Sequence, residues 1–328
     1  MINNHSLLYV FIFLFTLTLT VLSGRLIMPF LRKRAEQPIY TEGPSWHVSK
    51  AGTPTMGGLF FVISISAALL LSALYKYLEN DAFGSISLLI CLIYSIINAS
   101  IGVIDDLTKL RHNKNAGLTP RAKLILQFIS SILFLLARRI FLEDSTTLSF
   151  PFLNADIGIL YYFISLIILV GITNCANLTD GVDGLASSVA FGIGISLFYV
   201  SFSRIDTAGI ITSSLIAATI GFLFFNIHPA KVFMGDTGSL FLGSLIASLA
   251  FEMNNPFIAV ISGGVYVIEG ISVIAQVITY KICKKRLFKM APIHHHLEKC
   301  GWDENKICIC ALILTLLFTV PVLLICAQ

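Results

Sequence analysis

The sequence is poor in charge. Only 12% of its 328 residues are Asp, Glu, Lys or Arg, about half the share found in an ordinary soluble domain, whereas 56% are hydrophobic. This composition excludes an ordinary soluble globular domain and predicts a membrane protein. The net charge of +4 is small for a chain of this length, and we expect no nucleic-acid partner.

Several common signatures are also missing. The sequence contains no GxxxxGK[ST] phosphate-binding loop and no dinucleotide-binding fingerprint. Its seven cysteines are odd in number, form no CxxC pair and fall mostly in apolar runs, so we predict no disulfide framework. No internal repeat or second domain is visible, and we predict a single integral membrane domain over residues 1–328.

Long apolar runs recur from end to end. A helix needs about 20 apolar residues to cross roughly 30 Å of hydrocarbon, and ten runs approach or exceed this length. They cover residues 6–29, 57–78, 84–104, 123–142, 157–174, 184–204, 208–227, 237–254, 256–282 and 307–327. Because lipid cannot satisfy backbone polar groups and the runs lack a barrel's alternation, we predict an all-α polytopic fold of about ten transmembrane helices. The run at 256–282 is longer than one straight span requires, which predicts a kink or a break.

The basic residues predict the orientation of these spans. The loops after the first, third, fifth, seventh and ninth runs carry every Lys and Arg except Lys76, Arg138, Arg139 and Arg204. By the positive-inside rule these loops are cytoplasmic. With ten spans, both termini are then expected outside.

Acidic residues near a bilayer are candidates for function because charge is costly there. On the face predicted to be cytoplasmic they occur in three motifs: GVIDDLTKL with Asp105 and Asp106, NLTDGVDGLA with Asp180 and Asp183, and VFMGDTGS with Asp236. Converging carboxylates repel one another unless a cation compensates, and oxygen-rich sites suit Mg²⁺, which also takes phosphate ligands. The leading hypothesis is therefore a metal–phosphate site.

Taken singly, each motif also has an ordinary interpretation as a helix cap, a tight turn or a solvated charge. Their gathering on one face favours a functional site. Basic side chains to neutralise phosphate are available nearby: Lys50, Lys109, Lys114, Arg121 and Lys123.

A run of three histidines, in APIHHHLEKCGW, follows a lysine-rich stretch. Zinc binding with Cys283 or Cys300 is an alternative, but the spacing matches no zinc pattern. Histidines here offer donors whose charge adapts near neutral pH. Glu269 and Gln276, seven residues apart, share a helical face in the ninth run; Glu269 is equally compatible with a buried structural carboxylate and with a catalytic one.

Six motifs are similar, in order, to those of the polyprenyl-phosphate N-acetylhexosamine-1-phosphate transferases: QPIYTEGPSWHVSKAGTPTMGG, GVIDDLTKL, GLTPRAKLILQ, NLTDGVDGLA, FNIHPAKVFMGDTGSLFLG and APIHHHLEKCGW. The resemblance runs from about Gln37 to beyond Trp302. APIHHHLE resembles the branch that uses a muramyl-pentapeptide donor and differs from the sister enzymes that use UDP-GlcNAc.

The resemblance implies a Mg²⁺-dependent enzyme of the bacterial inner membrane, usually dimeric, with a cytoplasmic active site. It would transfer phospho-MurNAc-pentapeptide from UDP-MurNAc-pentapeptide to undecaprenyl phosphate, giving lipid I and UMP. By motif it implies catalytic roles for Asp105, Asp106, Asp236 and His294, with Asp236 also holding the metal. It implies substrate binding by Lys50, Thr55, Lys109, Lys123, Asn177, Asp180, Asp183, Asn226, Gln276, His295 and His296.

Three residues depart from the family's pattern: Tyr40, Trp46, and Gly270 where a hydroxyl is common. Two routes stay open, direct attack by the lipid phosphate and a two-step path through a phosphoryl-aspartate on Asp105. Two rival functions also stay open. One is the sister UDP-GlcNAc-dependent transferase, and the other is a secondary transporter, although transporters place binding residues near the midplane of paired repeats.

Overall fold

The structure, a computed structural model, describes residues 4–35, 50, 52–112, 117–150, 153–202 and 206–326. Within these ranges the chain is almost entirely helical, and eight helices are long and apolar enough to cross a membrane. The all-α polytopic fold is therefore confirmed. The helices are α1 (Asn4–Arg34), α2 (Leu59–Leu78), α3 (Ala82–His112), α4 (Pro120–Phe141), α5 (Ile159–Thr179), α6 (Leu185–Ser201), α7 (Asp206–Asn226), α8 (Gly235–Glu252), α9 (Phe257–Ser262), α10 (Gly264–Cys283), α11 (Ile293–Lys299) and α12 (Glu304–Cys326).

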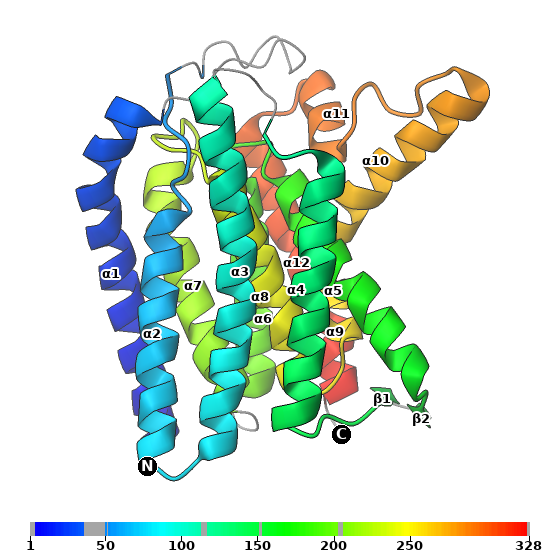
Figure 1. The fold of residues 1–328 in the computed structure, drawn as a ribbon. Helices are drawn as coiled ribbons and strands as arrows, with labels where there is room; N and C mark the ends of the chain where they lie inside the picture. Colours follow the sequence, from blue (N-terminus) through cyan, green and yellow to red (C-terminus); the bar gives the residue numbers. More distant parts are fainter. Residues whose placement is uncertain are drawn as a thin grey trace.

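Each predicted apolar run falls on a helix, and the run at 256–282 is broken as expected. The break lies at Gly263, between α9 and α10. At Gly264 an added Cβ would lie 2.7 Å from the ring of Phe318 in α12, so a side chain has no room there. Beyond this contact α10 leaves the bundle and projects to one side (Figure 1).

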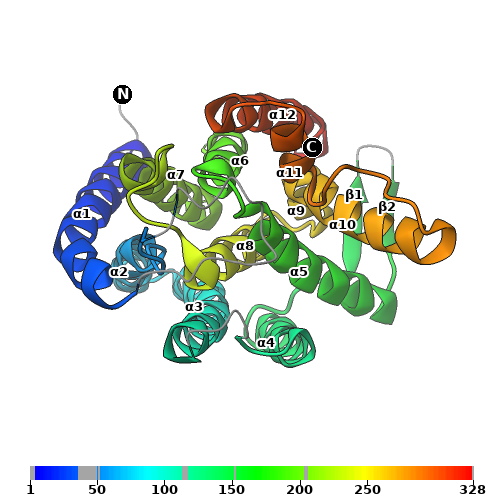
Figure 2. The same ribbon diagram turned by 90° about the horizontal axis from the view of Figure 1, so that it is seen from above.

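Helix α8 forms the centre of the bundle. Every residue from Thr237 to Glu252 is buried, and α2, α3, α5, α6 and α7 surround the helix (Figure 2). Two neighbours approach it at glycines: a Cβ at Gly58 would lie 2.2 Å from Cα of Gly238, and one at Gly102 would lie 2.3 Å from the Asp236 carbonyl oxygen. Small residues allow such close backbone contact between helices, and here they place the start of α8 against α3.

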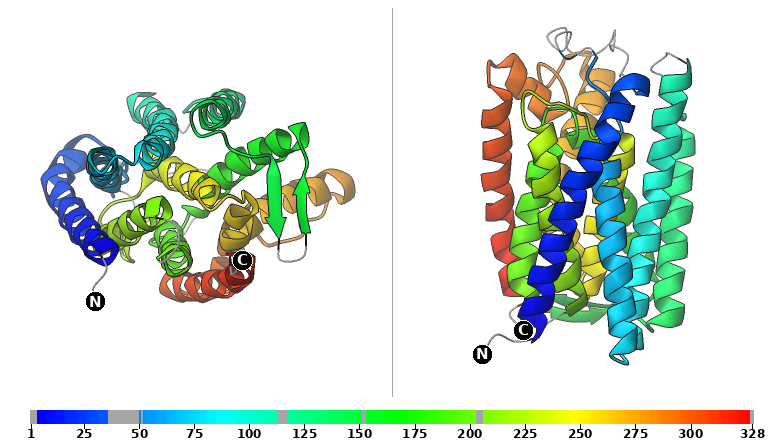
Figure 3. Two further views of the ribbon diagram at one scale, coloured as in Figure 1. Left: turned by 90° about the horizontal axis from the view of Figure 1, so that it is seen from below. Right: turned by 90° about the vertical axis from the view of Figure 1, so that its left-hand side faces the viewer.

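A two-stranded antiparallel hairpin, β1 (Thr147–Phe150) and β2 (Leu153–Asp156), lies across the end of the bundle where both termini are found (Figure 3). Its two short strands are not predicted from the sequence pattern. Beside it the buried guanidinium of Arg138 pairs with Glu252, contacts Asp144 at 2.5 Å and donates to the Phe251 carbonyl at 3.1 Å. Both carboxylates compensate the buried charge, which ties α4 to the end of α8.

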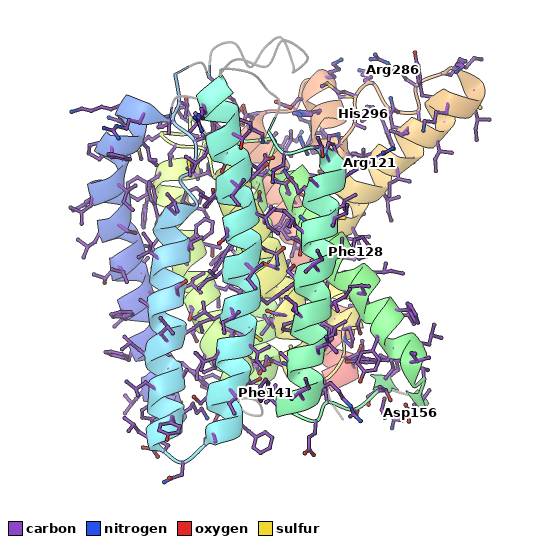
Figure 4. The ribbon with its side chains drawn as sticks, viewed as in Figure 1. Arg121, Phe128, Phe141, Asp156, Arg286 and His296 are labelled. Carbon is purple, nitrogen blue, oxygen red and sulfur yellow. The ribbon has the colours of Figure 1, made fainter. Side chains whose placement is uncertain are left out.

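The two ends of the bundle differ in the residues they carry. Arg121, Arg286 and His296 lie at one end, whereas Phe141 and Asp156 lie at the other (Figure 4). The start of α1 and the end of α12 both lie at the second end (Figure 1), which is the arrangement that an even number of crossings produces.

Candidate active site

Three carboxylates meet at the first end of the bundle. Asp105 and Asp106 lie near the C-terminal end of α3, and Asp236 lies in the first turn of α8. Single oxygens of the three all lie within 4.8 Å of one another. Helix α3 continues to His112, well past the predicted limit at residue 104, so two of the three carboxylates project from regular helix. All the donors are hard carboxylate oxygens, which fit Mg²⁺.

Two lysines bridge two of these carboxylates. The Lys109 Nζ atom lies 2.6 Å from Asp105 Oδ2 and 2.9 Å from Asp236 Oδ2. The Lys123 Nζ atom lies 2.6 Å from Asp236 Oδ2 and 3.3 Å from Asp105 Oδ2. Asp105 is further fixed by a hydrogen bond of 2.7 Å from the Leu118 amide to its Oδ1. The two carboxylates therefore hold two ammonium groups side by side.

Asp106 makes a different set of contacts from its neighbour. It is 3% exposed, and it accepts hydrogen bonds from the amides of Asp236 at 3.1 Å and Thr237 at 2.9 Å and from the Thr237 hydroxyl at 2.7 Å. Helix α8 has no side-chain cap of its own. Asp106 therefore supplies from α3 the acceptor that the first amides of a helix need, and it fixes where α8 begins.

The last turn of α5 adds an amide, and the residue that follows the helix adds a further carboxylate. Asn177 Nδ2 donates to Asp236 Oδ1 at 2.8 Å and to the Ser239 hydroxyl at 2.7 Å. Burial, together with the nearby carboxylates of Asp236 and Asp106, raises the pKa of Asp180 well above its ordinary range. A raised pKa keeps this carboxyl group protonated, and a cation bound nearby would favour its ionised form.

Asp183 and Lys50 do not join these carboxylates. The Lys50 Nζ atom pairs with Asp183 Oδ1 at 2.8 Å and with Glu304 Oε2 at 2.7 Å. Asp183 Oδ2 lies 3.1 Å from His228 Nδ1 and accepts from the Ala230 amide at 3.0 Å. These residues form a separate polar cluster. It joins the start of α12 to the loop that follows α5 and to the loop that follows α7.

Sequence reasoning missed two members of that cluster, Glu304 and His228. Among the described residues it is the second group able to hold a metal, through Asp183, His228 and Glu304, although the Lys50 ammonium already compensates its carboxylates. His228 was visible only as part of FNIHPA, and Glu304 only as one more charge after the histidine run.

Several other expected substrate-binding residues brace loops. Asn226 Oδ1 accepts from the Gly184 amide at 3.1 Å, and its Nδ2 donates to the Val232 carbonyl at 3.0 Å. Gln276 Oε1 accepts from the amides of Leu287 and Phe288 at 3.0 and 2.9 Å. The Thr55 hydroxyl is close to the carboxylate site, 2.8 Å from where a Cβ would stand on Gly235, a residue with φ of +75°.

The three histidines lie on α11 and take three different partners. His294 Nδ1 lies 3.1 Å from Glu269 Oε2, His295 Nδ1 lies 2.5 Å from Glu298 Oε2, and His296 Nδ1 accepts from the Lys289 amide at 3.1 Å. Neither metal-capable group in the described part of the chain includes any of them, so the geometry gives no support to zinc binding here. Lys114, Tyr40 and Trp46 lie outside the described residues.

Comparisons with known proteins show which family the sequence resembles. The family described as glycosyl transferase family 4 matches residues 87–254, and a phospho-N-acetylmuramoyl-pentapeptide-transferase signature matches residues 50–62. A protein of that name from Halalkalibacterium halodurans is 41% identical over 302 residues, 91% of each chain. Relatives of the same name from Clostridium botulinum (41% over 305 residues, 92% of this chain and 91% of the relative) and Caldicellulosiruptor bescii (39% over 297 residues, 89% of each) are similar over most of their length.

A helical membrane bundle with this carboxylate and lysine site at one end, matched over half its length by glycosyl transferase family 4, is a membrane-embedded transferase. The chain belongs to the phospho-N-acetylmuramoyl-pentapeptide transferase family. Its members are enzymes, and the transporter alternative is therefore set aside.

Proposed function

We propose that the protein transfers phospho-MurNAc-pentapeptide from UDP-MurNAc-pentapeptide to undecaprenyl phosphate, producing lipid I and UMP. The observation that carries the proposal is the pair of ammonium groups, Lys109 and Lys123, shared between the carboxylates of Asp105 and Asp236. The setting we infer is one membrane domain, residues 1–328, in the bacterial inner membrane, acting as a homodimer. The site would face the cytoplasm and both termini would lie outside.

The reaction joins two anions. A lipid phosphate oxygen bonds to the sugar-bearing phosphorus of the donor, and the bond from that phosphorus to the UMP oxygen breaks. Most of the barrier reduction in such reactions comes from alignment and charge neutralisation. Lys109 and Lys123 place two ammonium groups at one point, and their carboxylate partners hold both in position before substrate arrives. A cation on these carboxylates would leave the ammonium groups available to the phosphates.

Asp236 is the residue we assign to Mg²⁺, with Asp105 and Asp106 within reach. Bound Mg²⁺ supplies positive charge to the pyrophosphate. Asn177 holds Asp236 Oδ1 through a hydrogen bond of 2.8 Å, which directs that carboxylate. Asp106 has two proposed roles: it caps the start of α8, and it is one of the three carboxylates of the metal site.

The lipid phosphate needs little help from a base. The second pKa of a phosphomonoester is about 6, so the nucleophile is already largely ionised at neutral pH. Asp105, held by the Leu118 amide and by both lysines, is then more useful for orientation than for proton transfer. We therefore favour direct attack, and a radioactive phosphoryl-enzyme trapped with donor alone would contradict it.

The remaining residues are assigned to the donor side. His294 would approach the diphosphate from α11, beside the loop that holds Asp180. Substrate binding is assigned to Lys50, Thr55, Asn177, Asp180, Asp183, Asn226, Gln276, His295 and His296. Asn226 and Gln276 act through the loops that they brace.

The test is UMP release by the purified protein in detergent with undecaprenyl phosphate and Mg²⁺, comparing UDP-MurNAc-pentapeptide with UDP-GlcNAc. We expect release with the muramyl donor alone, lost on chelation and in Asp236→Asn. Asp156→Asn, which changes an exposed carboxylate at the opposite end, is the matched control and should keep full activity. Release only with UDP-GlcNAc would assign the protein to the sister branch, and release with neither donor would overturn the proposal.

A further inference from the structure

Glu269 is a buried carboxylate that the proposed chemistry does not use. It lies in α10 and is 3% exposed. Burying an ionised carboxylate is costly unless it is paired and hydrogen-bonded. Its Oε2 atom lies 3.1 Å from Nδ1 of His294 and accepts from the backbone amide of the same residue at 3.3 Å. Glu269 therefore contacts both the ring and the backbone of one histidine.

His294 is fully buried, with no exposed surface. Neither ring nitrogen makes a well-formed hydrogen bond to a described residue, although Nδ1 is within ion-pair distance of Glu269. The Nε2 atom faces the loop at 180–184: a Cβ added to Gly181 would lie 2.3 Å from it. The imidazole thus stands between the carboxylate of α10 and the loop that carries Asp180.

The position of Glu269 determines what Nε2 can do. In a histidine, the group beside one ring nitrogen fixes the protonation of the other. A carboxylate beside Nδ1 favours a proton there, and the backbone amide of His294 holds the same carboxylate oxygen in place. Nε2 is then kept facing the loop at 180–184.

We propose that Glu269 is a positioning residue for His294. It holds Nδ1 toward its own carboxylate and Nε2 toward the loop at 180–184, so that the imidazole keeps one orientation when this loop binds the nucleotide donor. The proposal rests on the proposed function, and Glu269 acts through His294 without touching the donor.

The first test is a double-mutant cycle on kcat/KM for UDP-MurNAc-pentapeptide. We expect Glu269→Leu to lower kcat/KM by about 10- to 100-fold, the size of effect seen when a residue that orients a metal-ligating histidine is lost. Glu269→Gln keeps an oxygen acceptor and should retain more activity than Glu269→Leu. The double variant Glu269→Leu/His294→Ala should be no worse than His294→Ala alone. Losses that multiply in the double variant would overturn the proposal, because they would show that Glu269 acts independently of His294.

The second test does not depend on activity. Diethyl pyrocarbonate modifies accessible histidines, and mass spectrometry measures the rate at each one. We expect His294 to react slowly in the wild type and several-fold faster in Glu269→Leu. The side chain of His228, 34% exposed, serves as the internal reference. Glu252→Gln, which alters a buried carboxylate at the opposite end, is the control and should leave the His294 rate unchanged.

Equal protection of His294 in the wild type and in Glu269→Leu would overturn the proposal. Faster modification in both Glu269→Leu and Glu252→Gln would also overturn it, since general loosening of the fold would then be the cause. If the wild type releases UMP with neither donor, the proposed function fails, whereas the modification rates still decide whether Glu269 holds His294.

Discussion

The adjacent aspartates of α3 should respond differently to substitution, because Asp106 caps another helix and Asp105 does not. Removing the Asp106 carboxylate in Asp106→Ala leaves the amides of Asp236 and Thr237 without their acceptor at the buried start of α8. A buried donor left unsatisfied costs about 1–3 kcal/mol, which gives about 2–6 kcal/mol for two. Water can enter from the nearby surface, so we expect the free energy of unfolding to fall by about 3 kcal/mol.

The assay is denaturation of the detergent-solubilised protein, followed by the helical circular dichroism signal. Asp106→Asn keeps one acceptor oxygen and should lose about half as much stability as Asp106→Ala. Asp105→Asn weakens the hydrogen bond from Leu118 and the contacts with Lys109 and Lys123. Because both lysines keep Asp236 as a partner, a loss of about 1 kcal/mol is expected. Loss of UMP release in Asp106→Ala with an unchanged free energy of unfolding would refute the capping role.

Three further outcomes are expected. Mg²⁺ at about 100 times its dissociation constant should raise the free energy of unfolding by about 2.7 kcal/mol, and a thermal-shift measurement that finds the same rise in Asp236→Asn would exclude that residue as a ligand. Gly270→Thr should cost about 1–3 kcal/mol by overpacking, since an added Cβ would lie 2.3 Å from the Cys175 sulfur; denaturation should show most of this loss restored by Cys175→Ala, and no restoration would contradict the packing argument. Arg138→Leu should cost about 3–5 kcal/mol because Glu252 is left as an unpaired buried charge; in the same denaturation assay, Arg138→Leu/Glu252→Leu should be less destabilised, and an equal loss would show that the pair is not the cause.

The transmembrane helices could be predicted from the sequence because lipid allows few other backbone structures. The sequence-based predictions fail for elements whose presence or length does not depend on hydropathy. Helix α3 runs past residue 104 since its backbone hydrogen bonds and the Asp105–Lys109 pair continue where apolar residues stop. The hairpin and α11 are elements of four to seven residues, too short to show a periodic pattern.

The sequence predicted which residues belong to the candidate site, but not which of them contact one another. Spacing along one helix predicts that Lys109 lies near Asp105, whereas nothing local predicts that Asp106 caps α8 or that Glu304 reaches Asp183, a residue 121 positions away. Gly270 is a similar case. It departs from the family's pattern, and its neighbour Cys175 in α5 supplies the reason.

The burial of α8 has a consequence for how the protein is made. Although α8 is 18 residues long, it is not among the eight helices that are apolar enough to cross a membrane alone. Its glycines, serines and threonine face other helices, so it never needs the hydrophobicity that lipid contact demands. A nascent segment of this kind is poorly retained by the bilayer, yet α2, α3, α5, α6 and α7 are all synthesised before it. Because these five helices precede α8 in the sequence, they are already in the membrane when α8 leaves the insertion machinery, and α8 can pack against them directly.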